Sequence, residues 1–169
     1  MQIATFKDMY IAELQELRSL EAQLADALPR MAAAASHPSL KKLLADHRQK
    51  TLAKEERLES ILSRHKAKVR EHTDQAMQAL IAETKKMQMI VTVPHLRDAA
   101  LIASTLKVAH YAIAAYGSAA ALAGQLDLRD DQNLLRESLE EEKKADFICV
   151  GSPKAKSTKP PWPHSAGRA

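Results

Sequence analysis

The chain has 169 residues, of which 46% are hydrophobic and only four are glycine, and its formal net charge is +4 at pH 7. This length suits one domain with a sizeable core, and the single cysteine excludes an internal disulfide framework. The prevalence of alanine, leucine, lysine and glutamate favours an all-α protein. No apolar run approaches about 20 residues and the first residues lack a signal-like pattern, so we expect a cytoplasmic protein without a membrane span.

The positive charge is concentrated at the C-terminal end. Residues 151–169 contain four of the 25 basic residues and no acid, and the remaining 21 basic residues equal the 21 acidic residues. Residues 1–150 are therefore formally neutral, which argues against nucleic-acid binding by the folded part. Since 151–169 also holds four of the seven prolines, we expect a disordered basic tail after a folded domain at 1–150. The abrupt change in composition fits either a genuine tail or a shifted reading frame.

The first predicted helix, 6–34, carries an apolar stripe with a carboxylate at its centre. Thr5 and Asp8 have the spacing of a capping box, which marks the start of a helix. The stripe recurs every three or four residues, as one face of a helix requires, and consists of Tyr10, Leu14, Leu17, Glu21, Leu24, Leu28 and Met31. A carboxylate in such a stripe is costly to bury unless it is paired or binds a metal, so Glu21 is the first candidate functional residue.

The second predicted helix, 39–65, has a stripe with a polar centre. The stripe consists of Leu40, Leu44, His47, Thr51, Lys54, Leu58, Ile61 and His65. Lys50 lies on the flank of this stripe, between His47 and Lys54. The basic segment 63–72 that follows is expected to be a solvated helix end and connection.

The long helix predicted at 94–126 has an inward stripe rich in alanine. Small side chains let a neighbouring helix approach closely and leave room for larger groups. The stripe continues from Leu101 or Ile102 through Thr105, Ala109, Ala112, Tyr116, Ala119 and Ala123.

The last predicted helix, 130–150, again has carboxylates at inward positions. Glu142 and Asp146 continue a stripe that begins with two leucines. A shorter helix is predicted at 73–89, with Ala76, Leu80 and Thr84 facing inward. Four long amphipathic helices with one short helix between the second and third predict an antiparallel four-helix bundle.

Four segments of the chain resemble one known family. They read FKDMYIAELQELRSLEAQLADALPRMAAAA, HRQKTLAKEERLESIL, RDAALIASTLKVAHYAIAAYG and LLRESLEEEKKAD. Together, over residues 5–147, they resemble the YciE/YciF family of bacterial ferritin-like proteins. The resemblance implies a ferritin-like bundle, at least a dimer, an association with stress responses, and a dinuclear metal site at mid-bundle. It places Glu21 and Glu142 at ligand positions of the first and last helices, with Asp146 one turn beyond.

The chain departs from the family at other expected ligand positions. In the second helix, relatives typically read HLEET, whereas this chain reads HRQKT from His47 to Thr51 and then has Lys54. In the long third helix, relatives carry Glu-His-Tyr-Glu, whereas this chain has alanine at 109 and 112, flanking His110 and Tyr111. The resemblance thus puts Lys50 and Lys54 at two ligand positions and alanines at two others.

The surviving candidate metal ligands are Glu21, Glu142 and Asp146, with His47 and His110 as candidate nitrogen donors. A dinuclear centre needs about six ligands, mostly carboxylates, so we expect no intact centre and no cofactor. We expect His47 to be a core histidine and His110 to serve packing or an interface.

The charges of these carboxylates suggest a sharper hypothesis, in which a lysine side chain takes the place of the metal. The ammonium group of Lys54, with Lys50 as a further candidate, would offset the charges of Glu21 and Glu142. The alternative is that both lysines extend to solvent and water hydrates Glu21. The two core tyrosines, Tyr10 and Tyr116, are expected to fill the ends of the core, the alternative being hydrogen bonds to mid-bundle carboxylates.

The sequence therefore favours a ferritin-like, stress-associated protein with a degenerate metal site, acting as a non-catalytic structural homo-oligomer, dimeric or larger. The alternative is an oxidoreductase or storage protein that binds iron or manganese with a reduced ligand set. Nucleic-acid binding through the tail and residues 64–70 is a third, less favoured hypothesis.

Overall fold

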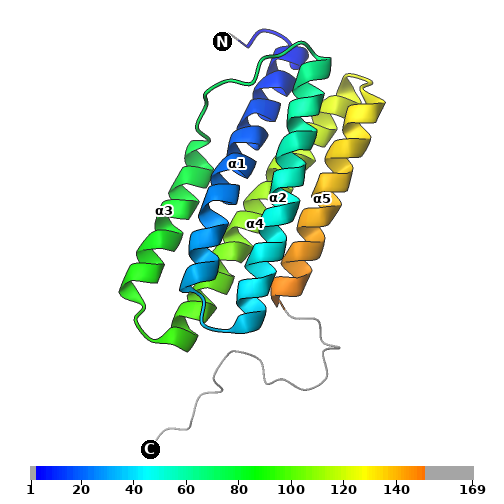
Figure 1. The fold of residues 1–169 in the computed structure, drawn as a ribbon. Coiled ribbons are helices and arrows are strands. Elements are labelled where there is room, and N and C mark those ends of the chain that lie inside the picture. The colour runs from blue at the N-terminus through cyan, green and yellow to red at the C-terminus, as the bar shows by residue number, and fades with distance from the viewer. Residues whose placement is uncertain (1–2, 151–169) are drawn as a thin grey trace, which may run out of the picture.

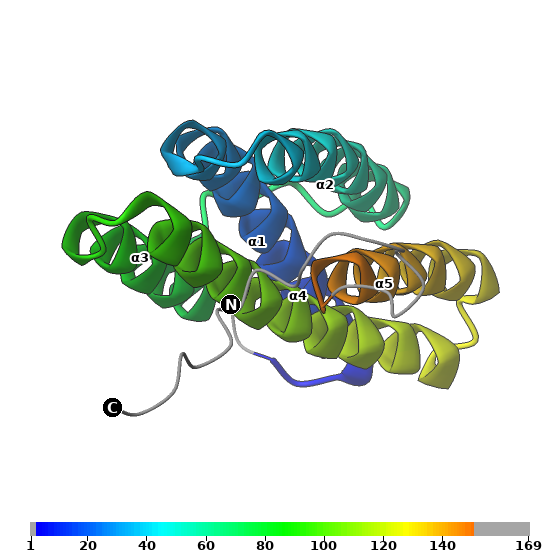
Figure 2. The ribbon, with the colours of Figure 1, turned by 90° about the horizontal axis from the view of Figure 1, so that it is seen from below.

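A computed structural model describes residues 3–150, apart from the side chains of residues 145–150. The described part contains five helices and no strand: α1 (Phe6–Ala34), α2 (Pro38–Arg64), α3 (Gln75–Ile90), α4 (Pro94–Gln125) and α5 (Arg129–Val150). The four long helices form an antiparallel bundle, and α3 packs against α1 and α4 on its outside (Figures 1 and 2). The predicted fold is confirmed, whereas the prediction for 151–169 lies outside the described residues.

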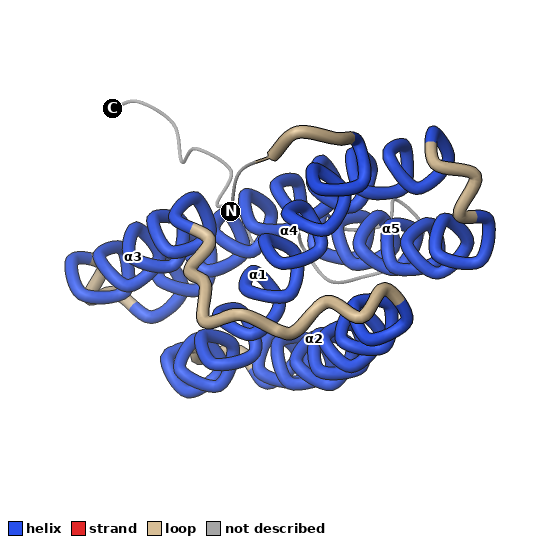
Figure 3. The backbone as a smooth tube through the Cα atoms, turned by 90° about the horizontal axis from the view of Figure 1, so that it is seen from above, coloured by secondary structure: helices blue, strands red, loops and turns tan. Residues whose placement is uncertain are grey.

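The bundle consists of two antiparallel hairpins. One is α1–α2, the other is α4–α5, and the chain returns between them along the length of the bundle through α3 (Figure 1). A loop from the end of α2 crosses one end of the bundle to reach α3 (Figure 3). Because the four long helices run side by side, one residue from the middle part of each can meet at the centre of the bundle.

Local sequence signals account for the helix ends. Thr5 and Asp8 form the predicted capping box, since Thr5 Oγ1 accepts from Asp8 N at 3.1 Å and Asp8 Oδ2 accepts from Thr5 N at 3.0 Å. Lys66 and Asp127 follow α2 and α4 with φ of 55°, the left-handed conformation that closes a helix end. In each case the next residue's N–H donates back to a carbonyl five residues earlier.

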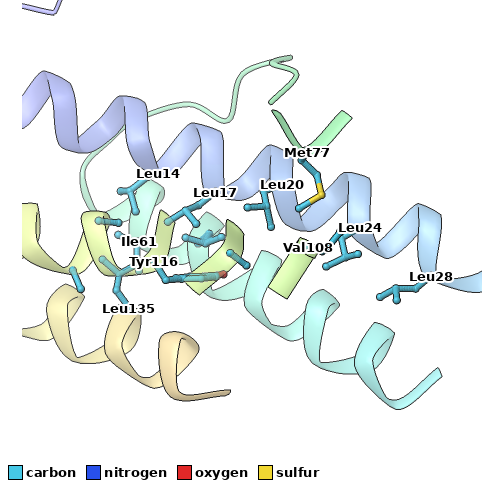
Figure 4. Packing of buried hydrophobic residues seen from close by; sticks show 14 of the residues in the cluster. Leu14, Leu17, Leu20, Leu24, Leu28, Ile61, Met77, Val108, Tyr116 and Leu135 are labelled. Carbon is cyan, nitrogen blue, oxygen red and sulfur yellow. The ribbon is translucent and has the colours of Figure 1, made fainter. Parts of the chain in front are cut away.

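The core is built from the predicted apolar stripes. The leucines of α1 form a row that points toward the other helices (Figure 4). The inward face of α3 differs slightly from the prediction, because Met77 and Thr84 are buried whereas Ala76 is exposed. Met77 offers more apolar surface than Ala76, so its burial contributes more to stability.

α4 does not match the expectation that no segment is apolar enough for a membrane. By length and composition this helix could cross a bilayer, but core helices of bundles pass the same test. Of the residues in its most apolar window, 39% are buried inside the bundle. In this structure α4 contributes Leu101, Val108 and Tyr116 to the core.

The loop between α2 and α3 is fastened to α1 by polar side chains. Gln15 Nε2 donates to Lys68 O at 2.8 Å, and Gln15 Oε1 accepts from Arg70 N at 3.1 Å. Ser19 Oγ donates to His72 O and accepts from Asp74 N, each at 2.9 Å. Gln15 and Ser19 are buried polar residues that the sequence interpretation missed, and their four-residue spacing beside the apolar stripe was the available signal.

Candidate functional site

One residue from each long helix meets at the centre of the bundle. Glu21 comes from α1, Lys54 from α2, Tyr116 from α4 and Glu142 from α5, and we call these four the central cluster. Glu21, Lys54 and Tyr116 are 0% exposed and Glu142 is 1% exposed. Each lies on the inward stripe of an amphipathic helix, so the same periodicity that builds the core also positions the cluster.

Lys54 lies against both carboxylates. Its Nζ is 3.0 Å from Glu21 Oε1 and also forms an ion pair with Glu142 Oε1. Because these carboxylates belong to α1 and α5, the ammonium group joins both hairpins of the bundle. A buried charge without a partner would be strongly destabilising, so these contacts matter to the fold.

Tyr116 completes the cluster from α4. Its hydroxyl donates to Glu21 Oε1 at 2.7 Å, and the centre of its ring is 5.7 Å from Lys54 Nζ. Burial and the negative charge of Glu21 raise the pKa of Tyr116 well above its ordinary value, so the phenol stays protonated. The expectation that Tyr116 merely fills the core was therefore incomplete, because its hydroxyl binds a carboxylate.

Several polar atoms in and beside the central cluster lack a hydrogen-bond partner among the described residues. They are Glu21 Oε2, Glu142 Oε2, His47 Nε2 and Thr51 Oγ1. His47 is 7% exposed, and its Nε2 lies 3.8 Å from Glu142 Oε1, beyond hydrogen-bond distance. Burial, helped by the positive charge of Lys54, lowers the pKa of His47 to about 4, so this histidine is neutral at pH 7.

The other candidate residues lie elsewhere. Lys50 is exposed, so it does not share the buried position of Lys54, and this part of the lysine hypothesis is corrected. The physical reason is that Lys50, one turn before Lys54, lies on the flank of the stripe, where a long charged side chain can extend to solvent. His110 is exposed on the outside of α4. Asp146 belongs to α5, but its side chain lies outside the described residues.

The donor set does not fit the dinuclear metal centre that the sequence resemblance implies. Such a centre draws carboxylate and histidine ligands from all four helices. Here α4 brings Ala109 and Ala112, which are 1% and 0% exposed and have no ligand atoms, and α2 brings an ammonium group. Among the described residues, no three acidic, histidine or cysteine side chains are grouped so that they could hold an ion.

Another buried carboxylate lies near the end of the bundle where α2 finishes and α5 begins. Asp131 is 4% exposed, and its partners are Tyr10, Arg64 and His65, which together with it form the Asp131 cluster. Asp131 Oδ1 pairs with Arg64 at 2.8 Å, and Oδ2 lies 2.6 Å from His65 Nε2 and accepts from the Tyr10 hydroxyl at 3.0 Å. Both carboxylate oxygens therefore have partners.

Sequence patterns gave little warning of the Asp131 cluster. An acidic residue in the first turn of a helix is a common feature that the helix dipole favours. Its partner Tyr10 is 121 residues away along the chain. The expectation that Tyr10 simply fills the end of the core was incomplete for the same reason as for Tyr116.

Comparison with known proteins identifies the family of this chain. The family model described as domain of unknown function DUF892 matches residues 5–147. Protein YciF of Escherichia coli K12 is 38% identical over 148 residues, which span 87% of this chain and 89% of YciF.

Two solved structures share the fold. That of the E. coli stress protein YciF has a TM-score of 0.84 and 36% identity, covering 88% of this chain and 94% of YciF. That of YcfI, described as a putative structural protein from Rhodopseudomonas palustris, has a TM-score of 0.86 and 29% identity, covering 89% of this chain and 96% of YcfI. The chain therefore belongs to the DUF892 family, the YciE/YciF family that its sequence motifs resemble.

Proposed function

We propose that this chain is a stress-associated structural protein that works without a metal centre and without catalysis. The observation that carries the proposal is the position of Lys54 Nζ, which contacts both central carboxylates. An ammonium group supplies positive charge but no lone pair, so it takes up carboxylate oxygens that a metal would need. The two structural relatives are described as a stress protein and a putative structural protein, which is in keeping with this role.

The test is the metal content of the native protein. The chain is produced with iron and manganese supplied and purified without chelator, and bound metal is then counted per chain. We expect substoichiometric metal and no oxidation of added Fe²⁺ above the uncatalysed rate. Stoichiometric iron or manganese would contradict the proposal.

One observation favours the alternative, a metal-binding oxidoreductase or storage protein with a reduced ligand set. Glu21 Oε2, Glu142 Oε2 and His47 Nε2 have no partner among the described residues, and all three are atoms that bind divalent cations. For a metal to use them while Lys54 stays in place, the ion would have to sit beside a buried ammonium group. The resulting charge repulsion makes this arrangement the weaker candidate.

We also propose that the chain forms a homodimer through the outer face of α4 and the first turns of α1. No charged residue occurs from Tyr111 to Leu126. Phe6 and Met9 are 59% and 42% exposed, beside a shallow hollow lined with Glu13, Ser118, Ala121, Leu122 and Gln125. Apart from Glu13, this face consists of small, apolar and uncharged polar side chains, which suits close packing against an identical copy.

The dimer is tested by light scattering on the eluting protein. The native chain should have twice the mass of a monomer, and Ala121→Arg should shift it toward the monomer. Lys86→Ala, on the exposed side of α3, is the control and should stay dimeric. A monomeric native chain, or a dimer unaffected by Ala121→Arg, would contradict the proposed contact.

A further inference from the structure

The turn between α3 and α4 exposes a run of apolar side chains at one end of the bundle. Residues 89–96, which we call the apolar corner, contain no lysine, arginine, aspartate or glutamate. Met89 and Ile90 are 73% and 62% exposed, and Val93 and Leu96 are exposed as well. Large apolar side chains that are exposed singly are normal, but a contiguous group of them marks a contact surface.

Basic residues flank the apolar corner. Residues 84–97 contain three basic residues and no acid, and residues 27–45, at the end of α1 and the start of α2, contain three more and no acid. Arg30, Lys41 and Lys85 are exposed and form no ion pair among the described residues. The exposed acids that border these segments each lie about one helical turn farther from the end of the bundle: Asp26, Asp46 and Glu83. This end therefore has an excess of positive charge, although residues 1–150 are neutral as a whole.

Polar contacts join the turn between α1 and α2 to the start of α4. The carboxylate of Asp98 accepts from Ser36 N at 2.7 Å and from His37 N at 2.9 Å. Arg97 Nε donates to Ala34 O at 2.9 Å. Asp98 is buried against these N–H groups, so it offsets little of the positive charge at the surface. The two turns thus form one continuous surface, which we call the basic end of the bundle.

The C-terminal end of α5 lies at the same end of the bundle (Figure 1). Residues 151–169, which follow α5 in the sequence, contain four basic residues, no acid and Trp162. This composition adds positive charge where the basic end already has an excess, so like charges oppose docking of residues 151–169 on the corner. A second copy that docked through the same face would also bring like charges together. Charge complementarity therefore favours an anionic partner.

We infer that the apolar corner docks this chain on the surface of an anionic lipid bilayer. The aliphatic side chains of the corner would enter the interface, while the surrounding lysines and arginines lie at the phosphate headgroups. A nucleic acid would use the positive charge but not the aliphatic side chains, because bases are bound through hydrogen bonds and stacking. Docking of this kind leaves α4 within the bundle, and it goes beyond the proposed structural function.

The experiment is co-sedimentation of the full chain with vesicles of phosphatidylcholine alone, or of phosphatidylcholine and phosphatidylglycerol in equal parts. The double variant Met89→Ser with Ile90→Ser removes apolar side chains from the corner, and Lys85→Gln removes one charge beside it. Val69→Ser and Lys68→Gln are the matched controls, because both residues are exposed in the loop between α2 and α3, at the opposite end of the bundle. Circular dichroism checks that every variant keeps its helix content.

We expect the native chain to bind the anionic vesicles alone, and to be released when the salt concentration rises from about 0.1 M to about 0.5 M. Binding should fall at least tenfold for the double serine variant and about fivefold for Lys85→Gln, and the controls should match the native chain. Absence of binding to the anionic vesicles, or equal binding by the double serine variant, would overturn the inference.

Two further measurements distinguish the other occupants of this surface. Tighter binding of the native chain to a DNA duplex than to the anionic vesicles would assign the basic end to nucleic acid. A lower mass of the double serine variant than of the native chain by light scattering would assign the corner to a second copy. Either result would overturn the inference, whereas weak DNA binding and an unchanged mass would support it.

Discussion

The central cluster and the Asp131 cluster each bury a carboxylate among partners from several helices, but they use their hydrogen-bonding capacity differently. Every carboxylate oxygen of the Asp131 cluster has a partner. In the central cluster, one oxygen of Glu21 and one of Glu142 have none among the described residues. Buried polar groups are normally satisfied, because an unpaired group keeps the full cost of desolvation.

The hydrogen-bonding capacity of the buried carboxylate is therefore filled in the Asp131 cluster, whereas each carboxylate of the central cluster keeps one unpaired oxygen. The Asp131 cluster fastens the start of α1 and the end of α2 to the start of α5, and both oxygens of its carboxylate are used. The central cluster holds two carboxylates around one ammonium group, with a neutral histidine beside them. We interpret it as a buried ion-pair cluster in which one ammonium group lies between two carboxylates that keep unpaired oxygens.

The largest expected effect is loss of the Lys54 charge. Lys54→Met keeps the side-chain length but leaves two buried carboxylates without a cation, which should lower the free energy of unfolding by about 3–5 kcal/mol. Urea denaturation followed by circular dichroism measures this. The matched control is Lys50→Met, one turn earlier and exposed, which should change stability by less than about 0.5 kcal/mol. Similar small losses for both variants would show that the central ion pairs contribute little.

Acid should act on the central cluster through His47. Burial holds its folded-state pKa at about 4, below the ordinary value of 6.5, so the unfolded chain binds this proton more readily. Stability from this group is therefore complete above about pH 6.5 and is lost as the pH falls toward 4, by up to about 3 kcal/mol.

The measurement is the free energy of unfolding between pH 7 and pH 4 for the native chain and for His47→Gln. Glutamine cannot be protonated, so the variant should lose less stability over this range, and the difference between the two curves isolates His47. Parallel curves would mean that His47 accepts a proton in the folded chain as readily as in the unfolded one. In that case the negative charge of Glu142 would be stabilising the protonated imidazole of His47.

Removing the carboxylate of the Asp131 cluster should cost less than removing Lys54. Asp131→Asn keeps the shape but loses the charge that pairs with Arg64 and His65, for an expected loss of about 2–3 kcal/mol. The matched control is Asp130→Asn, the exposed neighbour in the same helical turn, with an expected loss of about 0.3–1 kcal/mol from the helix dipole. Equal losses of stability for the two variants would mean that Asp131 contributes only as a negative charge at the start of a helix.

Much of the bundle was predictable because its helices are long and strongly periodic. The stripe on α1 is buried from Tyr10 to Met31 as predicted, and the predicted helix bounds differ from the observed ones by two residues at most. Lys54 and Glu142 fall on the same kind of stripe, so their burial followed from spacing. Which groups would touch did not follow, because contact depends on how the helices are rotated and packed.

The contacts that the sequence concealed are those between a common local pattern and a distant partner. Asp131 resembles an ordinary residue of a first helical turn until Tyr10 is brought to it from the other end of the chain. Gln15 and Ser19 resemble the edge of a polar helix face until the loop after α2 lies over them. Periodicity reports which face is buried, but it does not report what covers a polar position.

The two tyrosine hydroxyls give the smallest and most direct comparison of the clusters. Tyr116→Phe removes the bond to Glu21, whose Oε2 already lacks a partner, so that carboxylate keeps only Lys54. Tyr10→Phe removes the bond to Asp131, which keeps both Arg64 and His65. A hydrogen bond to a charged group contributes about 1.5–3 kcal/mol, so we expect Tyr116→Phe near the upper end of this range and Tyr10→Phe at or below its lower end. Urea denaturation of both variants at pH 7 measures the difference. If Tyr10→Phe proved the more costly, the unpaired oxygens of the central cluster would have to be satisfied in solution, and the contrast between the two clusters would disappear.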